Sequence, residues 1–149
     1  MCRGTLKAIG LVTSLAIVTL ACAANVARAD VRDGAYHGMI VCEKLQNTKF
    51  MLIAPLDITI AGKKVTAARP IFNLQGSRVV ASEIATGIVA DDGTIYFLSN
   101  WQGAGSSFQG HYKGTITEKG GTLTGTQDWT MADGKQSRAC SVAVVSTRS

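Results

Sequence analysis

The strongest constraint on this chain is a series of short segments in which apolar and polar residues alternate, separated by turns rich in glycine and aspartate. A period of two is typical of half-buried β-strands, and no segment carries helical periodicity over about ten residues. The expected strands are residues 36–43, 50–60 (bent or broken at Pro55), 65–69, 84–90, 94–101, 107–117, 122–131 and 137–145, with weaker candidates at 71–74 and 79–83. Eight or nine short strands joined by tight turns indicate an antiparallel meander.

Such a meander must protect its edge strands, and closure into a barrel removes the edges completely. We therefore predict an all-β fold, a small antiparallel up-and-down barrel of about eight strands, with a β-sandwich as the alternative. The sequence Asp91-Asp92-Gly93 predicts a hairpin turn rather than a pair of catalytic carboxylates. Gly110, Gly114 and Gly125 lie on the strand faces that carry Tyr112 and Trp129, where glycine leaves room for large rings in a curved wall.

The first 29 residues have the pattern of a signal peptide. Arg3 and Lys7 precede an uncharged run from residue 8 to 24, and Ala27-Arg28-Ala29 fits the small-x-small cleavage pattern. Cleavage after Ala29 leaves residues 30–149 as one domain, with no stable membrane span. A retained membrane helix is the first alternative, although 17 residues are few for a bilayer span of roughly 20. Lipidation at Cys22 is the second alternative.

The charge balance argues against nucleic-acid binding. The leader removes three of the 15 basic residues and none of the ten acidic ones, so twelve minus ten leaves the domain at +2. The longest basic run is Lys63-Lys64, whereas binding to phosphates requires several clustered cations. With 46% hydrophobic and 17% charged residues, the chain also lacks the composition of a disordered tail.

Two cysteines remain after the leader, Cys42 and Cys140. In the oxidising compartment outside the inner membrane two such thiols are expected to pair, which would join the first strand to the last. There is no Cys-x-x-Cys motif, and two sulfurs alone do not complete a zinc site, so we expect no metal and no cofactor.

No residue pattern predicts catalysis. His37 and His111 alternate with Tyr36 and Tyr112, so if the tyrosines point inward the histidines point outward. The serines near residue 106 lack the motif of a nucleophile elbow. We therefore predict a protein that is not an enzyme, and an enzyme with an unrecognised site, carried by one of these histidines, is kept as an alternative.

The segment 100–107 is the most informative irregular stretch, because a tryptophan beside a glycine-rich loop could line the mouth of a barrel. Alternatively, the loop is a long hairpin connection whose tryptophan covers the core. Arg69 and Arg78 are further candidate polar groups near such a mouth. The candidate ligand-binding residues are Asn100, Trp101, Gln102, Phe108, Tyr112, Trp129 and Arg138.

Three groups of residues carry a resemblance to known exported proteins. They are Asp33-Gly34-Ala35-Tyr36-His37-Gly38 with Cys42, then Tyr112-Lys113-Gly114-Thr115-Ile116 and Leu123-Thr124-Gly125-Thr126-Gln127-Asp128-Trp129, and finally Arg138-Ala139-Cys140. This layout resembles small, uncharacterised exported proteins of Gram-negative bacteria, particularly alphaproteobacteria, and covers both ends of the domain but not its middle. The Gly/Thr/Trp strands also look like avidin and lipocalin barrels. The resemblance implies a fold and an exported location but no activity and no site residues.

These observations favour a non-enzymatic protein in the periplasm or outside the cell, which binds a small ligand at the barrel mouth or a partner through its loops. An inhibitor of an extracellular hydrolase, such as a protease or a lysozyme, is the second hypothesis, because a small barrel with one disulfide presents rigid loops.

Overall fold

Eight antiparallel strands form the whole wall of the molecule in the part of the chain that the computed structural model describes, residues 33–46, 48, 50–72, 78–103 and 105–148. The strands are β1 (Gly34–Cys42), β2 (Leu52–Ala61), β3 (Lys64–Phe72), β4 (Val79–Val89), β5 (Ile95–Gly103), β6 (Ser106–Ile116), β7 (Gly120–Met131) and β8 (Gly134–Ser146). These residues contain no helix. The predicted leader lies outside the described residues.

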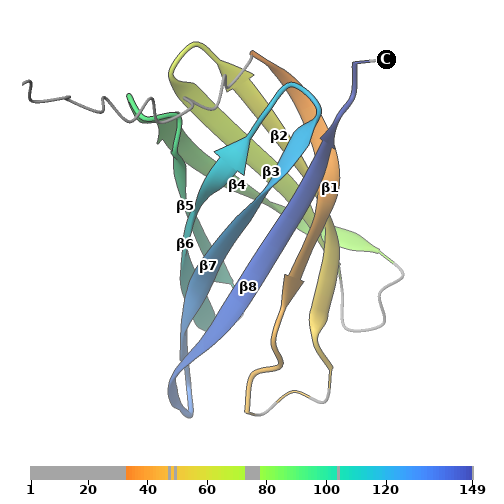
Figure 1. Cartoon of the computed structure of the whole chain (residues 1–149). Coiled ribbons are helices and arrows are strands. Elements are labelled where there is room, and N and C mark those ends of the chain that lie inside the picture. The colour runs from red at the N-terminus through yellow and green to blue at the C-terminus, as the bar shows by residue number, and fades with distance from the viewer. Residues whose placement is uncertain (1–32, 47, 49, 73–77, 104, 149) are drawn as a thin grey trace, which may run out of the picture.

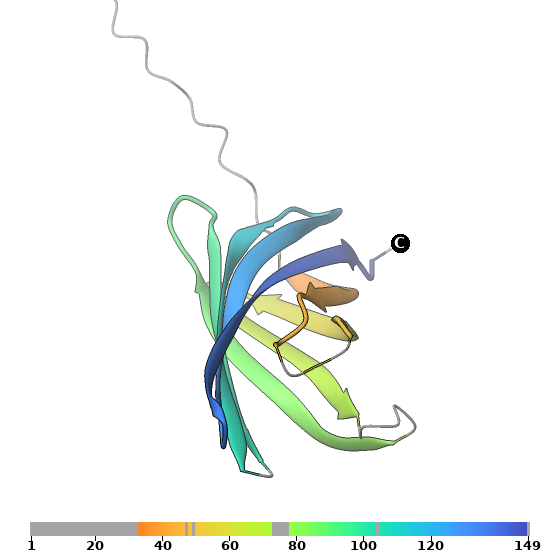
Figure 2. The same cartoon turned by 90° about the horizontal axis from the view of Figure 1, so that it is seen from below.

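The sheet is closed, as Figures 1 and 2 show from two directions. Each strand pairs with the next along the chain, and β8 pairs with β1 from Tyr36 opposite Ser146 to Cys42 opposite Cys140. The prediction of an eight-stranded up-and-down barrel is therefore confirmed, and the β-sandwich is wrong. Because the sheet is closed, every strand pairs with a strand on each of its two sides. The barrel therefore has no edge strand that could pair with another chain.

The disulfide between Cys42 and Cys140 lies at the seam between β1 and β8. The two residues face each other directly in the ladder, with 4.0 Å between their Cα atoms, and they are 98 positions apart in the chain. The predicted pairing of the first and last strands is confirmed. The bond fixes the strand ends at which the barrel closes, next to the candidate site.

The sequence predicts a bend or a break at Pro55, and the structure shows no break. β2 continues through it, with Pro55 opposite Met39 of β1. The pairing of β2 with β3 covers only Asp57–Ala61, so Pro55 lies where β2 has a partner on one side alone. Proline lacks the amide hydrogen of a ladder and is tolerated at such positions.

Two further expectations about the strands are wrong. The candidates 79–83 and 84–90 belong to one strand, β4, and the described part of 71–74 extends β3 past an irregularity between Ile71 and Phe72. The segment 100–107 is not a long loop, because β5 and β6 stay paired as far as Gly103 opposite Ser106. Gly105 has φ 77° in this turn, so glycine supplies the left-handed conformation that makes the connection tight.

The turn at Asp91-Asp92-Gly93 is confirmed. Gly93 has φ 83°, and the Asp92 carboxylate accepts a hydrogen bond of 2.8 Å from the amide of Thr94. The same hydrogen bond holds the pKa of the Asp92 carboxyl below its usual range. This carboxylate therefore stabilises a turn on the surface of the protein.

The strands place their connections at two opposite ends of the barrel. The β1–β2, β5–β6 and β7–β8 connections share one end, the lower one in Figure 1, which we call the aromatic end. The C-terminus lies at the other end. The middle of the barrel is packed with aliphatic side chains from facing strands, among them Ile40, Ile58, Ile95, Leu123 and Val142.

Candidate functional site

Three aromatic rings meet inside the barrel at the aromatic end, and we call Trp101, Phe108 and Trp129 the aromatic cluster. Trp101 faces Phe108 across β5 and β6, and Phe108 faces Trp129 across β6 and β7. Residues directly opposite in an antiparallel ladder point to the same side of the sheet, so the register alone gathers the rings. The Phe108 ring centroid lies 6.1 Å from that of Trp101 and 4.7 Å from that of Trp129. Phe108 is buried, whereas both tryptophans are half-buried.

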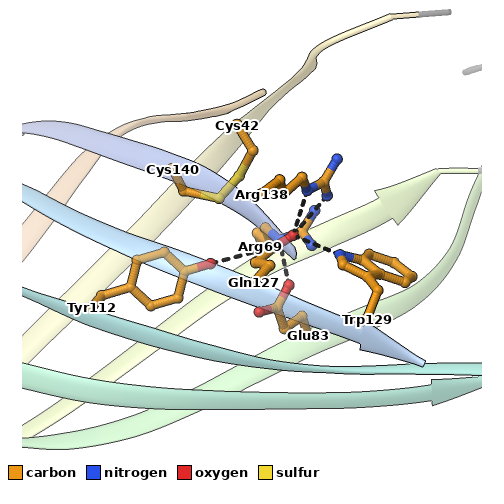
Figure 3. The surroundings of a disulfide bond; sticks show 8 residues. All are labelled: Cys42, Arg69, Glu83, Tyr112, Gln127, Trp129, Arg138 and Cys140. Carbon is orange, nitrogen blue, oxygen red and sulfur yellow. Dashed lines mark hydrogen bonds and ion pairs between the residues drawn. A yellow bond between two sulfur atoms is a disulfide. The ribbon is translucent and has the colours of Figure 1, made fainter. Parts of the chain in front are cut away.

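Gln127 is the centre of a group of hydrogen bonds one row deeper in the barrel (Figure 3). Its side-chain oxygen accepts hydrogen bonds from Nε and Nη2 of Arg138, at 2.9 and 2.6 Å, and one of 3.3 Å from the Trp129 indole. Its amide group donates a hydrogen bond of 2.8 Å to the Tyr112 hydroxyl. Side chains from β6, β7 and β8 are thereby joined around one buried amide.

Arg69 and Glu83 add a buried ion pair to this group. They face each other across β3 and β4, and the Arg69 Nε contacts a Glu83 carboxylate oxygen. We call Arg69, Glu83, Tyr112, Gln127 and Arg138 the polar network. It joins the aromatic cluster through its cations, because the Arg69 guanidinium carbon lies 5.8 Å from the Phe108 ring centroid and that of Arg138 lies 5.3 Å from the Trp129 ring.

Two glycines leave the space that the Tyr112 ring fills. A Cβ atom on Gly110 would lie 2.7 Å from Cε2 of this ring, and one on Gly125 would lie 2.6 Å from its Cδ1. Both distances are too short for real side chains, so larger residues would displace the ring from Gln127. The expectation that glycines make room for an aromatic side chain is confirmed at these two positions. It is wrong at Gly114, where a Cβ atom would meet the Thr122 carbonyl oxygen and Leu123 instead of a ring.

Burial shifts the pKa values of two members of the network. Burial raises the pKa of the Tyr112 hydroxyl above 10.0, although the hydrogen bond with Gln127 opposes this shift. Burial and then repulsion by Arg69 lower the pKa of the Arg138 guanidinium to about 10. In both groups burial disfavours the charged form.

In the described part of the barrel, the middle of the interior is filled by side chains around one small void. A void of about 10 Å³ lies beside Tyr112, which is room for a single water molecule at most. Its lining consists of Ile40, Leu56, Ala67, Arg69, Glu83, Ala85, Phe97 and Tyr112. This void is too small for an organic ligand, which favours a site at an end of the barrel or on its outer surface.

The structure divides the seven predicted ligand-binding residues between the two faces of the wall. Five point inward and meet at the aromatic end: Trp101, Phe108, Tyr112, Trp129 and Arg138. Asn100 and Gln102 are exposed and alternate with the inward Trp101. They line a hollow of about 900 Å³ to which all three residues of the aromatic cluster, Trp101, Phe108 and Trp129, also belong. Its other lining residues include the outward polar side chains of Gln109, Asp128, Thr130 and Lys135.

Sequence reasoning missed Gln127 and Glu83. Gln127 is two residues from Gly125 and two from Trp129 in β7, so its side chain points to the same face as theirs. Its inward direction was therefore predictable from the sequence. Glu83 has the same parity as the inward Ala85 in β4. Both were overlooked because glutamine and glutamate are mostly exposed in proteins.

The two histidines point outward, as predicted. His37 has a partner that the sequence did not reveal, because its Nδ1 lies 2.6 Å from a carboxylate oxygen of Asp57, directly opposite on β2. Both side chains are largely exposed to solvent. Among the residues that the structure describes, no three His, Cys, Asp or Glu side chains form a group able to hold a metal ion.

The fold and the site define a class, a small closed antiparallel β-barrel with a disulfide across its seam and an aromatic end. Comparison with known protein families, curated proteins and solved structures found no match to this chain. Over the described ranges, no helix has both the length and the apolar character needed to cross a bilayer.

Proposed function

We propose that this protein is an exported, non-enzymatic barrel that binds a small apolar ligand at its aromatic end. The single observation that carries the proposal is the aromatic cluster, in which two half-buried indoles lie beside a buried ring and above a polar network. Ligand sites typically combine aromatic walls with a few fixed polar groups. The filled middle of the barrel favours a ligand that rests against the rings rather than one enclosed deep inside.

The proposed location is the periplasm or the exterior of a Gram-negative bacterium. The Cys42–Cys140 disulfide is compatible with an oxidising compartment, where such bonds persist. The leader-like sequence before residue 30 supports the same location.

Tryptophan fluorescence tests the ligand proposal directly, because Trp101 and Trp129 are the two tryptophans of the chain and both belong to the cluster. We expect an apolar aromatic compound to change the emission and to raise the melting temperature. Trp129→Leu should weaken binding, whereas Leu98→Ala on the outer face should leave it unchanged. Constant emission and melting temperature with every ligand class at saturating concentration would contradict the proposal.

A protein partner, such as an extracellular hydrolase that this protein inhibits, is a second candidate. It is favoured by exposed apolar side chains around the β1–β2 connection, where Phe50 is 80% and Ile53 63% exposed. We expect one hydrolase to co-purify in stoichiometric amount with the wild type and to be lost with Phe50→Ser. Recovery of no enzyme from periplasm or host fluid would remove this candidate.

A further inference from the structure

The buried charges at the aromatic end do not balance. Among the described residues, the buried charged side chains are Arg69, Glu83 and Arg138, which together carry one net positive charge. Glu83 is paired with Arg69. Arg138 is only 8% exposed, and its hydrogen bonds go to the neutral amide of Gln127.

This arrangement is energetically costly for the folded protein. A buried cation loses its hydration, and an amide oxygen with an indole ring compensates for that loss less well than a carboxylate does. Arg69 repels Arg138, and the charge of Glu83, which is paired with Arg69, opposes this repulsion. Burial, followed by repulsion from Arg69, lowers the pKa of the Arg138 guanidinium to about 10.

The guanidinium is also positioned to bind something else. Its Nε and Nη2 are held by Gln127, which fixes the plane of the group. Figure 3 shows the remaining nitrogen of Arg138 directed away from Gln127. Trp129 lies against the same guanidinium, so an anion bound there would be next to the aromatic cluster.

We infer that the ligand of the aromatic end is an anion, a flat apolar molecule with a carboxylate that binds Arg138 while its body packs on Trp101 and Trp129. This inference rests on the proposed function and narrows it to one class of ligand. A carboxylate matches the planar donors of a guanidinium and would supply the charge that the site lacks. A neutral ligand of the same shape would bind the rings and leave Arg138 uncompensated.

The test compares 2-naphthoate with its neutral isostere 2-naphthamide, by calorimetric titration of the full protein with its disulfide intact. We expect naphthoate to bind at least about tenfold more tightly than naphthamide. Equal affinities would overturn the inference and leave the proposed function standing. Binding of neither compound, with unchanged tryptophan emission, would contradict both.

Variants assign the preference to Arg138. Arg138→Gln should abolish the difference between the two compounds, and Arg138→Lys should keep part of it because the charge remains without the planar donors. The control is Lys119→Gln, which removes an exposed charge from the β6–β7 connection at the opposite end of the barrel and should leave the ratio unchanged. If folded Arg138→Gln still binds naphthoate more tightly than naphthamide, the inference is overturned. If this variant does not fold, the affinities of the wild type for the two compounds test the inference.

Discussion

At the scale of single residues, Gln127 has the largest structural consequence, because one amide holds side chains of three strands. Gln127→Met keeps the length of the side chain but removes the acceptor of Arg138. We expect a loss of about 2–3 kcal/mol in the free energy of unfolding, since a buried charge is left without its hydrogen bonds. Urea denaturation measures the loss. The double variant Gln127→Met/Arg138→Met should lose less than the sum of the single variants, and strict additivity would show that the two side chains are not coupled.

Tyr112 gives a second prediction at this scale, on alkaline stability. Its pKa in the folded protein lies above the value of 10.0 that applies to the unfolded chain. The stabilisation due to the neutral hydroxyl is therefore complete below pH 10 and is lost as the pH rises towards the folded-state pKa. Tyr112→Phe should reduce the loss of stability above pH 10, measured as the difference in urea midpoint from the wild type. Parallel pH profiles of the two proteins would contradict the burial of this hydroxyl.

Alternation alone does not predict the side-chain chemistry of this site. The parity of β7 points Trp129 and Gln127 to the same side, but the sequence does not say that Arg138 stands opposite Gln127. That register depends on the number of residues in the β7–β8 turn. The ion pair of Arg69 with Glu83 depends in the same way on the β3–β4 connection. The composition of the site was therefore partly predictable, and its contacts were not.

At the scale of elements, the strand ends were predictable from the sequence where a tight turn follows the strand. They were not predictable where strand pairing continues past a proline or a glycine. Asp-Asp-Gly fixed the β4–β5 hairpin, because only a few residue types favour that geometry. The sequence predicts a bend or a break at Pro55 and an interruption after Trp101. In the structure Pro55 lies within the β1–β2 ladder, and the β5–β6 ladder continues past Trp101 as far as Gly103. Local composition cannot show that a neighbouring strand covers only part of β2, which is what makes Pro55 acceptable.

The β1–β2 connection is the element that gives the next prediction. Leu45 is only 5% exposed although it belongs to no strand, and the next amide, that of Gln46, donates a hydrogen bond of 2.8 Å to the Gln136 side chain of β8. We expect Leu45→Ala to lower the free energy of unfolding by about 2–3 kcal/mol, within the range for buried leucines. Leu98→Ala, at a position 53% exposed, is the matched control and should cost less than about 0.5 kcal/mol. Equal effects in chemical denaturation would mean that the connection does not pack on the barrel.

At the scale of the whole molecule, closure, stability and the candidate site depend on the same seam. The disulfide joins β1 to β8 two residues from Arg138, so it holds the strand that presents this guanidinium. In the loop-entropy view a bond that closes about 100 residues contributes roughly 4–5 kcal/mol. Cys42→Ala/Cys140→Ala should therefore lower the melting temperature by on the order of 10 °C. In mass spectrometry, the native wild type should be lighter than its reduced form by the mass of two hydrogens. Because both cysteines are buried, the wild type should resist reduction until it unfolds. An unchanged melting temperature, or free thiols in the native protein, would mean that strand pairing alone closes the barrel.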